Sequence, residues 1–194
     1  TTSGSLYEDA LKFDKILTAR TFEKFSEDVD KTSWHMPAHM VNAYYSPDSN
    51  TIVFPAAILQ APFYSLEQSS SQNYGGIGAV IAHEISHAFD NNGAQFDKEG
   101  NLNKWWLDED YEAFEEKQKE MIALFDGVET EAGPANGKLI VSENIADQGG
   151  ITAALTAAKD EKDVDLKAFF SQWAKIWRMK ASKEFQQMLL SMDV

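Results

Sequence analysis

The run His83-Glu84-Ile85-Ser86-His87 constrains the fold of this chain more than any other part of its sequence. Residues four apart lie on one face of an α-helix, so His83 and His87 can reach a single metal ion if the run is helical. Glu84 then lies beside that ion, where a carboxylate can act as a base on a bound water. The run therefore predicts a helix that carries half of a catalytic zinc site.

The neighbouring sequence favours a buried helix from about residue 74 to residue 90. The apolar residues of the segment 77–82 precede the run. Asn91-Asn92-Gly93 follows it, and we expect Gly93 to end the helix in a left-handed conformation. The alternative is a buried helix whose two histidines hold no metal, and a five-residue pattern alone does not separate the two.

Composition limits the classes of protein to which the chain can belong. It has 194 residues, of which 43% are hydrophobic, which suffices for one substantial core. Its formal net charge of −14 argues against binding to nucleic acid, because phosphate contacts require an excess of Lys and Arg. No apolar segment has the length of a membrane span, so no membrane partner is expected. The chain has no Cys, which excludes thiolate ligands and disulfides.

Hydrophobic periodicity predicts further helices around this one. One or two are expected from residue 6 to about residue 30, and others at 107–125, from about 142 and at 165–180, with a polar loop at 127–137. The last of these helices is expected to face the core with a stripe formed by Leu166, Phe169, Phe170, Trp173, Ile176 and Trp177. Two short β-prone segments, 41–45 and 51–54, flank a Pro-Asp-Ser-Asn turn signal and predict a hairpin. The expected fold class is therefore α+β and predominantly helical, with a small sheet beside the helix of the His-Glu-x-x-His run.

The third zinc ligand has to come from elsewhere in the chain, since a catalytic zinc has three protein ligands and one open position. The chain contains four histidines, and none follows His87. Position 93, where another class of protease has its third histidine, is Gly93. We therefore expect a carboxylate ligand, unless His35 or His39 folds back to the site.

Glu143 is the strongest candidate among the acidic residues. Apolar Leu139-Ile140-Val141 precedes it, and a carboxylate in apolar surroundings needs a counter-charge such as zinc. Asp147 lies four residues on and shares its helical face. Asp147 can accept the outward N–H of one zinc histidine, and Asp90 that of the other. The alternative is that Glu143 and Asp147 cap or solvate the start of a helix.

Several unusual motifs between about Ser33 and Val194 occur in one order. They are Val41-Asn42-Ala43-Tyr44-Tyr45, Phe54-Pro55-Ala56-Ala57-Ile58-Leu59-Gln60, Asn73-Tyr74-Gly75-Gly76-Ile77-Gly78, His83-Glu84-Ile85-Ser86-His87-Ala88-Phe89-Asp90, Gly100-Asn101-Leu102, Trp105-Trp106 and Glu143-Asn144-Ile145-Ala146-Asp147. In these motifs the chain resembles the neprilysin-like (M13) zinc endopeptidases, and more closely their bacterial endopeptidase O branch. The resemblance implies a zincin-type, thermolysin-like core that uses one zinc ion per chain to hydrolyse peptide bonds of short peptides.

The resemblance also implies roles for individual residues. The implied zinc ligands are His83, His87 and Glu143. Glu84 would be the base, and Asp147 and Asp90 would orient the histidines, with Asp147 often counted among the family's catalytic residues.

Two groups of residues are implied to bind substrate. Asn42 and Ala43 would hold the substrate backbone along an edge strand, which agrees with the way exposed strand edges capture extended peptides. The implied apolar pocket for the residue after the cut consists of Ile58, Phe63, Val80 and Trp177. Ordinary core packing is the alternative for these four.

Relatives in this family are longer than 194 residues. They have a large helical lobe before the catalytic part, and a C-terminal segment with an oxyanion-stabilising His and a substrate-binding Arg. We therefore expect residues 1–194 to be part of a metallopeptidase catalytic domain, on which the remainder of the full-length peptidase packs, and to be weakly active or inactive alone. The expected location is the bacterial cytoplasm, with secretion or the cell surface as the alternative. The alternative function is a non-catalytic helical metal-binding or structural module.

Overall fold

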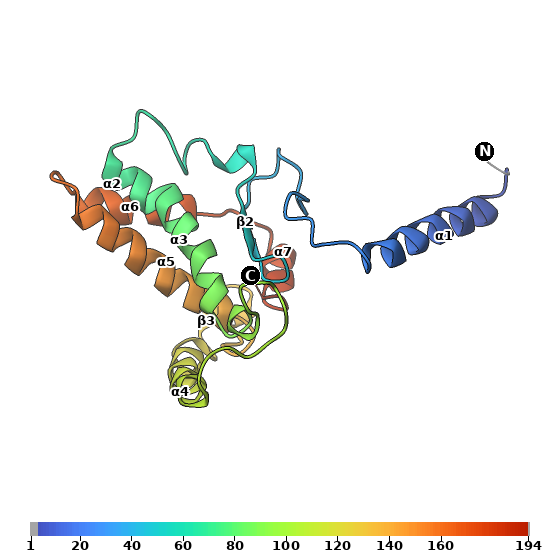
Figure 1. Ribbon diagram of the computed structural model, residues 1–194. Helices are drawn as coiled ribbons and strands as arrows, with labels where there is room; N and C mark the ends of the chain where they lie inside the picture. Colours follow the sequence, from blue (N-terminus) through green and yellow to red (C-terminus); the bar gives the residue numbers. More distant parts are fainter. Residues whose placement is uncertain (1–3, 194) are drawn as a thin grey trace. The chain divides into compact units, whose positions relative to one another are not determined.

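The computed structural model describes residues 4–193, and its chain divides into two compact units, Thr1–Ser33 and Trp34–Val194 (Figure 1). The first unit contains the helix α1 (Leu6–Lys24). The side chain of Ser5 caps it by accepting a hydrogen bond from the backbone N–H of Glu8, as serine does at many helix starts. The helix ends at Lys24, short of the predicted residue 30, and none of its residues is buried.

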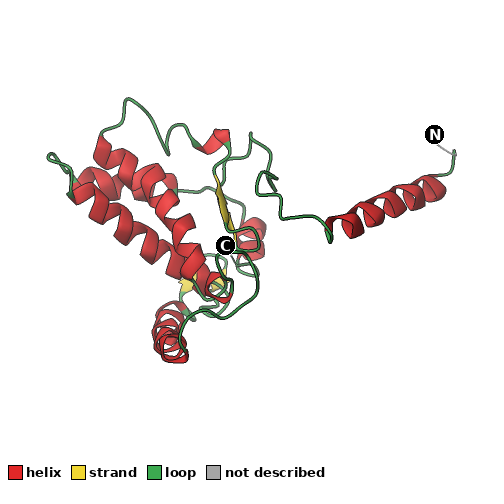
Figure 2. Ribbon diagram, in the orientation of Figure 1, coloured by secondary structure: helices red, strands yellow, loops and turns green. Residues whose placement is uncertain are grey.

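The second unit is mostly helical, with two small hairpins (Figure 2). Its elements are β1 (Tyr44–Ser46), β2 (Thr51–Val53), η1 (Ala56–Ile58), α2 (Ser70–Asn73), η2 (Tyr74–Gly78), α3 (Ala79–Ser86), η3 (His87–Phe89), η4 (Gly93–Gln95), α4 (Asp108–Phe125), β3 (Glu129–Thr130), β4 (Gly133–Pro134), α5 (Val141–Lys159), α6 (Leu166–Ile176) and α7 (Lys183–Leu189). The predicted α+β, predominantly helical class is confirmed. The loop expected between α4 and α5 contains the β3–β4 hairpin, and α7 had no counterpart among the predicted elements.

The predicted hairpin is formed by β1 and β2. The two strands pair antiparallel, with Tyr44 opposite Val53 and Ser46 opposite Thr51. Among the residues described, β1 has a strand neighbour on one side only, so its other edge is open to a further strand.

The predicted helix of residues 74–90 is present as the consecutive elements η2, α3 and η3. It is preceded by α2 and interrupted in η2, a π-helical turn in which Gly76 has non-helical torsions (φ −94°, ψ −108°). Gly75 allows α6 to approach, because a Cβ at this position would lie 2.1 Å from the carbonyl oxygen of Phe169. A single-turn π-helix of this kind often lies next to a functional site.

Helix α3 packs closely against α5, and the two ribbons run side by side in Figure 1. Small residues make this contact possible. A Cβ on Gly150 would lie 2.7 Å from the backbone nitrogen of His83, and one on Gly149 would lie 2.4 Å from Oγ of Ser86. Ala146, on the same face of α5, is completely buried. The close approach brings the first turns of α5 next to the histidine run.

Two apolar clusters form the core of the second unit. One joins Ala43, Ile58, Ile77, Val80 and Ile176, with Phe54 and Phe63 packed against it, and the other joins Ala79, Ala154, Ala158 and Phe169. The predicted core stripe of α6 is wrong for Leu166, Phe170 and Trp177, which are 42%, 44% and 48% exposed. The core contact of α6 is confined to the arc of Phe169, Trp173 and Ile176, spaced as one face of a helix requires. Within residues 4–193, no helix is long and apolar enough to cross a bilayer.

Candidate active site

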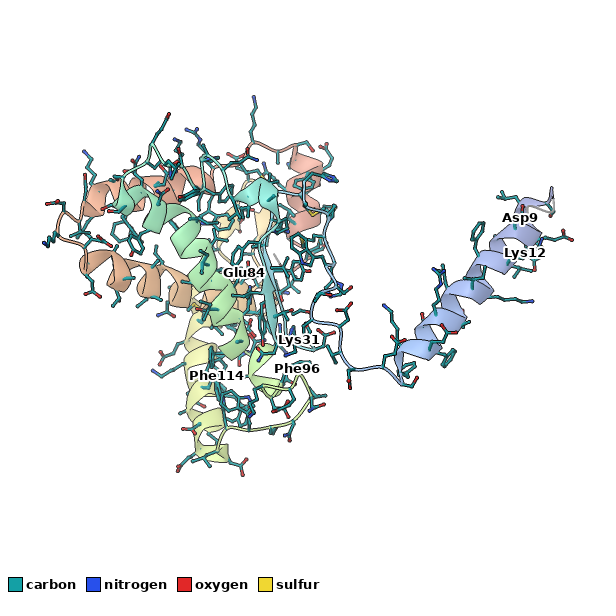
Figure 3. All side chains as sticks on the ribbon, turned by 45° about the horizontal axis from the view of Figure 1, so that its top comes forward. Asp9, Lys12, Lys31, Glu84, Phe96 and Phe114 are labelled. Atoms are coloured by element: carbon teal, nitrogen blue, oxygen red, sulfur yellow. The ribbon has the colours of Figure 1, made fainter. Side chains whose placement is uncertain are left out.

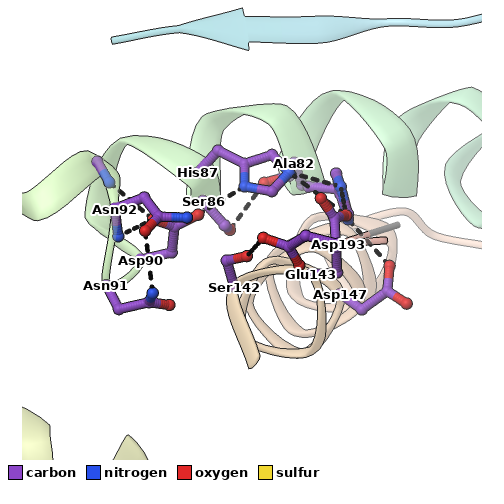
Figure 4. A network of polar contacts seen from close by, with 12 residues as sticks. Ala82, Ser86, His87, Asp90, Asn91, Asn92, Ser142, Glu143, Asp147 and Asp193 are labelled. Carbon is purple, nitrogen blue, oxygen red and sulfur yellow. Dashed lines mark hydrogen bonds and ion pairs between the residues drawn. The ribbon is translucent and has the colours of Figure 1, made fainter. Parts of the chain in front are cut away.

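The imidazole rings of His83 and His87 lie next to each other and next to a glutamate from α5. Figure 4 labels His87 and this glutamate, Glu143. The Nε2 atoms of His83 and His87 are 2.9 Å apart. Oε2 of Glu143 lies 3.3 Å from Nε2 of His83 and 3.6 Å from Nε2 of His87. Across the described part of the chain, these three side chains form the one group of potential ligands close enough to share a metal ion.

Each histidine ring also forms a hydrogen bond through Nδ1, the nitrogen that faces away from Glu143, with the carboxylate of an aspartate. Oδ1 of Asp147 lies 2.9 Å from Nδ1 of His83, and Oδ2 of Asp90 lies 2.6 Å from Nδ1 of His87. When Nδ1 donates its hydrogen to a carboxylate, the neutral ring keeps a lone pair on Nε2. Both Nε2 lone pairs can therefore be directed into the space shared with Glu143.

Asp90 is itself fixed by the backbone that follows the helix. Its Oδ1 accepts hydrogen bonds from the N–H groups of Asn92 and Gly93, both at 2.7 Å, and the residue is 2% exposed. Gly93 is needed for close approach, since a Cβ there would lie 1.9 Å from the carbonyl oxygen of His87. The prediction that Gly93 ends the helix in a left-handed conformation is wrong. The chain leaves the helix at Asp90, which is extended, and Gly93 starts η4 with a negative φ.

The donor set fits zinc. Two imidazole nitrogens and one glutamate oxygen are one of the ligand sets of catalytic zinc sites. Ligands at about 2.0–2.1 Å from one tetrahedral ion lie roughly 3.3 Å from each other. The separations of 2.9, 3.3 and 3.6 Å between these atoms are close to that value.

The same carboxylates set the charge of the metal-free site. Burial alone would lower the pKa of His83, but hydrogen bonds with Asp147 and Glu143 outweigh it and raise the pKa to about 9. Burial likewise opposes charge on His87, yet Asp90 and Glu143 raise its pKa to about 10. Glu143 responds in the opposite sense: burial would raise its pKa, but the two histidines lower it to about 2. The site is therefore suited to a positive charge enclosed by carboxylates.

Glu84 lies on α3 inside the second unit, where Figure 3 labels it. It is 6% exposed, and this burial raises its pKa, against the opposing charges of His83 and His87. It lines the same cavity as the histidines but does not belong to the ligand group. Its carboxylate accepts a hydrogen bond from the backbone of Tyr45, and from the cavity it could exchange a proton with a water molecule near the group.

A cavity of about 840 Å³ surrounds these residues. Its lining includes His83, His87, Glu143, Glu84, Asp90 and Asp147 together with all six predicted substrate-binding residues, Asn42, Ala43, Ile58, Phe63, Val80 and Trp177. Ile58 and Val80 are buried, whereas Phe63 is half-buried and Trp177 exposed. Asn42 and Ala43 directly precede β1, and the side chain of Asn42 accepts a hydrogen bond from the N–H of Ala43 at 3.0 Å. The cavity therefore joins the predicted metal, base and substrate residues.

The two remaining histidines lie outside the ligand group. The backbone N–H of His35 donates a hydrogen bond to the hydroxyl of Tyr44, and the rings of the two residues are 5.6 Å apart. His39 is exposed. The carboxylate alternative for the third ligand is the one that the geometry supports.

Sequence reasoning missed several residues of this cavity. Trp173 lines it and lies four positions before Trp177, so helical spacing had placed the two on one side of α6. Asn144 also lines it, and its Nδ2 is buried with no hydrogen-bond partner. Ser142, at the start of α5, donates a hydrogen bond to Asp193 at 2.6 Å (Figure 4). No local pattern could have paired these two, because they are far apart in the sequence.

Comparison with known proteins agrees with this geometry. Residues 42–194 match the sequence profile of Peptidase family M13, and the chain belongs to that family. The resemblance to neprilysin-like zinc peptidases is therefore confirmed.

Two curated relatives and one solved structure show what the chain is similar to. It is 99% identical over its whole length to a neutral endopeptidase of Lactococcus lactis subsp. lactis strain IL1403, of which it covers 31%. It is 59% identical over 85% of its length to a putative zinc metalloproteinase of Streptococcus gordonii, of which it covers 29%. The crystal structure of PepO from Lactobacillus rhamnosis superposes with a TM-score of 0.87 at 45% identity, over all of this chain and 31% of that one. The chain thus spans about a third of the length of the relatives it matches.

Proposed function

We propose that the chain forms part of the catalytic domain of a zinc metalloendopeptidase that hydrolyses peptide bonds of short peptides. The observation that carries this proposal is the convergence of Nε2 of His83, Nε2 of His87 and Oε2 of Glu143 on one point. The names of two relatives, a neutral endopeptidase and a putative zinc metalloproteinase, agree with it.

In this proposal zinc is held by His83, His87 and Glu143. When bound, it lowers the pKa of a water molecule toward ~7 and polarises the carbonyl of the peptide bond. Asp147 and Asp90 hold the two imidazole rings through Nδ1, so that in the neutral ring Nε2 would be the nitrogen available to the ion.

Glu84 moves the proton. Its carboxylate takes a proton from the attacking water and passes it to the leaving amine. Burial of Glu84 supports this role, because it raises the pKa of the carboxyl toward the range in which the group can both accept and return a proton.

The substrate would lie as an extended peptide along the free edge of the hairpin. Asn42 and Ala43, which directly precede β1, would hold its backbone, since an added strand forms backbone hydrogen bonds with the edge. The side chain after the cut would enter the apolar part of the cavity formed by Ile58, Phe63, Val80 and Trp177. We add Trp173 to this wall.

The remainder of a longer peptidase is the proposed partner of this chain. Ile81, Ile85 and Phe89 form an apolar stripe on the outer face of the histidine helix, where they are 38%, 49% and 50% exposed. Further protein packed on this side would remove the stripe from water. Without it, we expect residues 1–194 to bind zinc but to cleave peptides slowly. The absence of Cys agrees with a reducing compartment such as the bacterial cytoplasm, which we propose as its location.

Zinc content tests the proposal. The purified wild-type chain and the Glu143→Ala variant are dialysed against a zinc buffer and analysed by elemental mass spectrometry. Wild type should retain one zinc per chain and the variant should lose most of it. Glu112→Ala, an exposed acid on α4, is the matched control and should retain the metal. Equal zinc in wild type and Glu143→Ala, or none in wild type, would exclude the proposed site.

A further inference from the structure

The turn that carries Phe63 is held in place by hydrogen bonds from two helices. It has no regular secondary structure and lies between η1 and α2. The side-chain amide of Gln172, on α6, donates a hydrogen bond to the carbonyl oxygen of Pro62. The backbone N–H of Ile77, in η2, donates one to the carbonyl oxygen of Phe63 at 2.8 Å. The carbonyl groups of two consecutive residues, Pro62 and Phe63, therefore accept hydrogen bonds from two different elements, α6 and η2.

The break in the helix at Gly76 makes room for this arrangement. A Cβ on Gly76 would lie 2.3 Å from the carbonyl oxygen of Phe63 and 3.6 Å from Cγ of Gln172. The turn therefore fits between η2 and α6 only because position 76 has no side chain. The π-helical turn η2, its residue Gly76 and the side chain of Gln172 all lie next to this turn.

Gln172 is unusual among the residues that face the core from α6. It is 3% exposed, although its neighbours on the buried side of the helix, Phe169 and Ile176, are apolar. A buried amide is costly unless it is hydrogen-bonded, so the bond to Pro62 ties its position to that of the turn. A methionine of similar length would fill the same space without donating a hydrogen bond.

The two elements that Gln172 joins are two walls of one pocket. Phe63 comes from the turn, Trp173 from α6 and Trp177 from the residue that caps the end of α6, and all three line the cavity together with Val80. Trp173, the next residue along α6, lines the cavity, whereas Gln172 does not. The distance between the walls decides which side chains the pocket accepts.

We propose that Gln172 is a positioning residue that sets the width of the apolar pocket by holding Phe63 against α6. This inference rests on the proposed peptidase function and adds a determinant of substrate choice. Gln172 does not line the cavity and acts through the turn alone. Its loss should let the Phe63 wall shift, which weakens the preference for a large side chain after the cut.

The test compares two peptides that differ only in the residue after the cut, leucine or alanine. It uses the complete zinc-loaded peptidase that carries this chain. Wild type should favour the leucine peptide by on the order of 10²-fold in kcat/KM, as expected when several methylene groups fill an apolar pocket. Gln172→Met should reduce this preference about tenfold, mainly through KM of the leucine peptide, because small displacements of a pocket wall have large effects on rate.

Controls separate pocket positioning from general stability. Lys175→Met introduces the same side chain at an exposed position of α6 and should leave the preference unchanged. In a Phe63→Ala background, Gln172→Met should have no further effect, because the wall that it positions is already gone. Gln172→Asn keeps the amide but shortens its reach. It replaces Gln172→Met if that variant does not fold, and it should also lower the preference.

The possible results distinguish a failure of this inference from a failure of the proposed function. Equal losses on both peptides with the preference unchanged would assign Gln172 to stability alone and overturn the inference. A wild-type peptidase that cleaves neither peptide would overturn the proposed function itself. Cleavage by wild type with an unaltered preference in Gln172→Met would leave that function standing and remove only this inference.

Discussion

Oδ1 of Asp147 lies 2.9 Å from Nδ1 of His83, although the two residues are 64 positions apart in the chain. The contact links α5 to α3, and it involves the ring nitrogen of His83 that is not expected to bind the metal. It fixes which nitrogen of His83 carries the proton and which is available as a ligand.

Replacement of Asp147 by Asn should weaken zinc binding while leaving the ligands in place. An amide can donate as well as accept, so it no longer enforces the tautomer of His83 with Nε2 free. We expect a loss of about 10–100-fold in zinc affinity, typical for partners of zinc histidines. Competition with a chromophoric chelator measures this affinity. Asp163→Asn, an exposed acid after α5, is the control and should bind zinc as wild type does; an equal affinity of Asp147→Asn would contradict the role.

Replacement of Glu84 by Gln should separate metal binding from catalysis. The residue lines the cavity but lies outside the ligand group, so zinc content should stay at the wild-type level. Hydrolysis by the complete peptidase should fall about 10²–10⁴-fold, the usual contribution of a general acid–base residue. Metal analysis and peptide cleavage are measured on the same preparation. Full activity of Glu84→Gln would show that another group moves the proton.

Zinc binding should release protons and strengthen as pH rises. In the metal-free site the neighbouring carboxylates raise the pKa of His83 to about 9 and that of His87 to about 10, so the pair carries extra positive charge at pH 7. The two Nε2 atoms are 2.9 Å apart and share a hydrogen bond, and zinc binds neutral imidazole, hence at least one proton must leave the pair. Glu143, with its pKa lowered to about 2, is already ionised and releases none.

Calorimetric titrations in buffers of different ionisation heat count these protons. Near pH 7 the histidine pair should release at least one proton, and this release should disappear as the pH passes the two histidine values, leaving only the proton lost by the metal-bound water. The apparent affinity should rise most steeply over the same interval. An affinity that is flat between pH 7 and pH 9 would contradict the protonated metal-free pair.

Substitution of Gly150 by Ala should force α3 and α5 apart. The new Cβ would lie 2.7 Å from the backbone nitrogen of His83, and backbone atoms cannot move aside as a flexible side chain can. Overpacking of this kind costs about 1–3 kcal/mol, and here it also displaces Glu143 from the histidines. Thermal unfolding and zinc content should both fall. Gln148→Ala, at an exposed position of the same helix, should change neither; an unshifted melting temperature in Gly150→Ala would refute the close approach.

Local patterns in the sequence were sufficient to predict those helices and strands that are determined by interactions between neighbouring residues. The helix around the histidine run and the hairpin follow from spacing and turn residues, because backbone hydrogen bonds within a few residues define them. The same reasoning was wrong where contacts with residues distant in the sequence determine the conformation or burial of a residue. Gly93 was expected to end a helix through its own torsions, but it is required by the carbonyl of His87. Leu166, Phe170 and Trp177 were expected in the core, but they remain 42%, 44% and 48% exposed in the described chain.

The sequence by itself determined that two histidines share one face of a helix with a glutamate between them. It also narrowed the third ligand to a carboxylate and favoured Glu143. It could not bring that carboxylate to the histidines, because nothing in a local pattern states which helices touch. Only the tertiary structure decided this, through the contact of Gly149 and Gly150 with α3. The same holds for Gln172 and Pro62, whose hydrogen bond joins distant segments and exists only once α6 has packed beside η2.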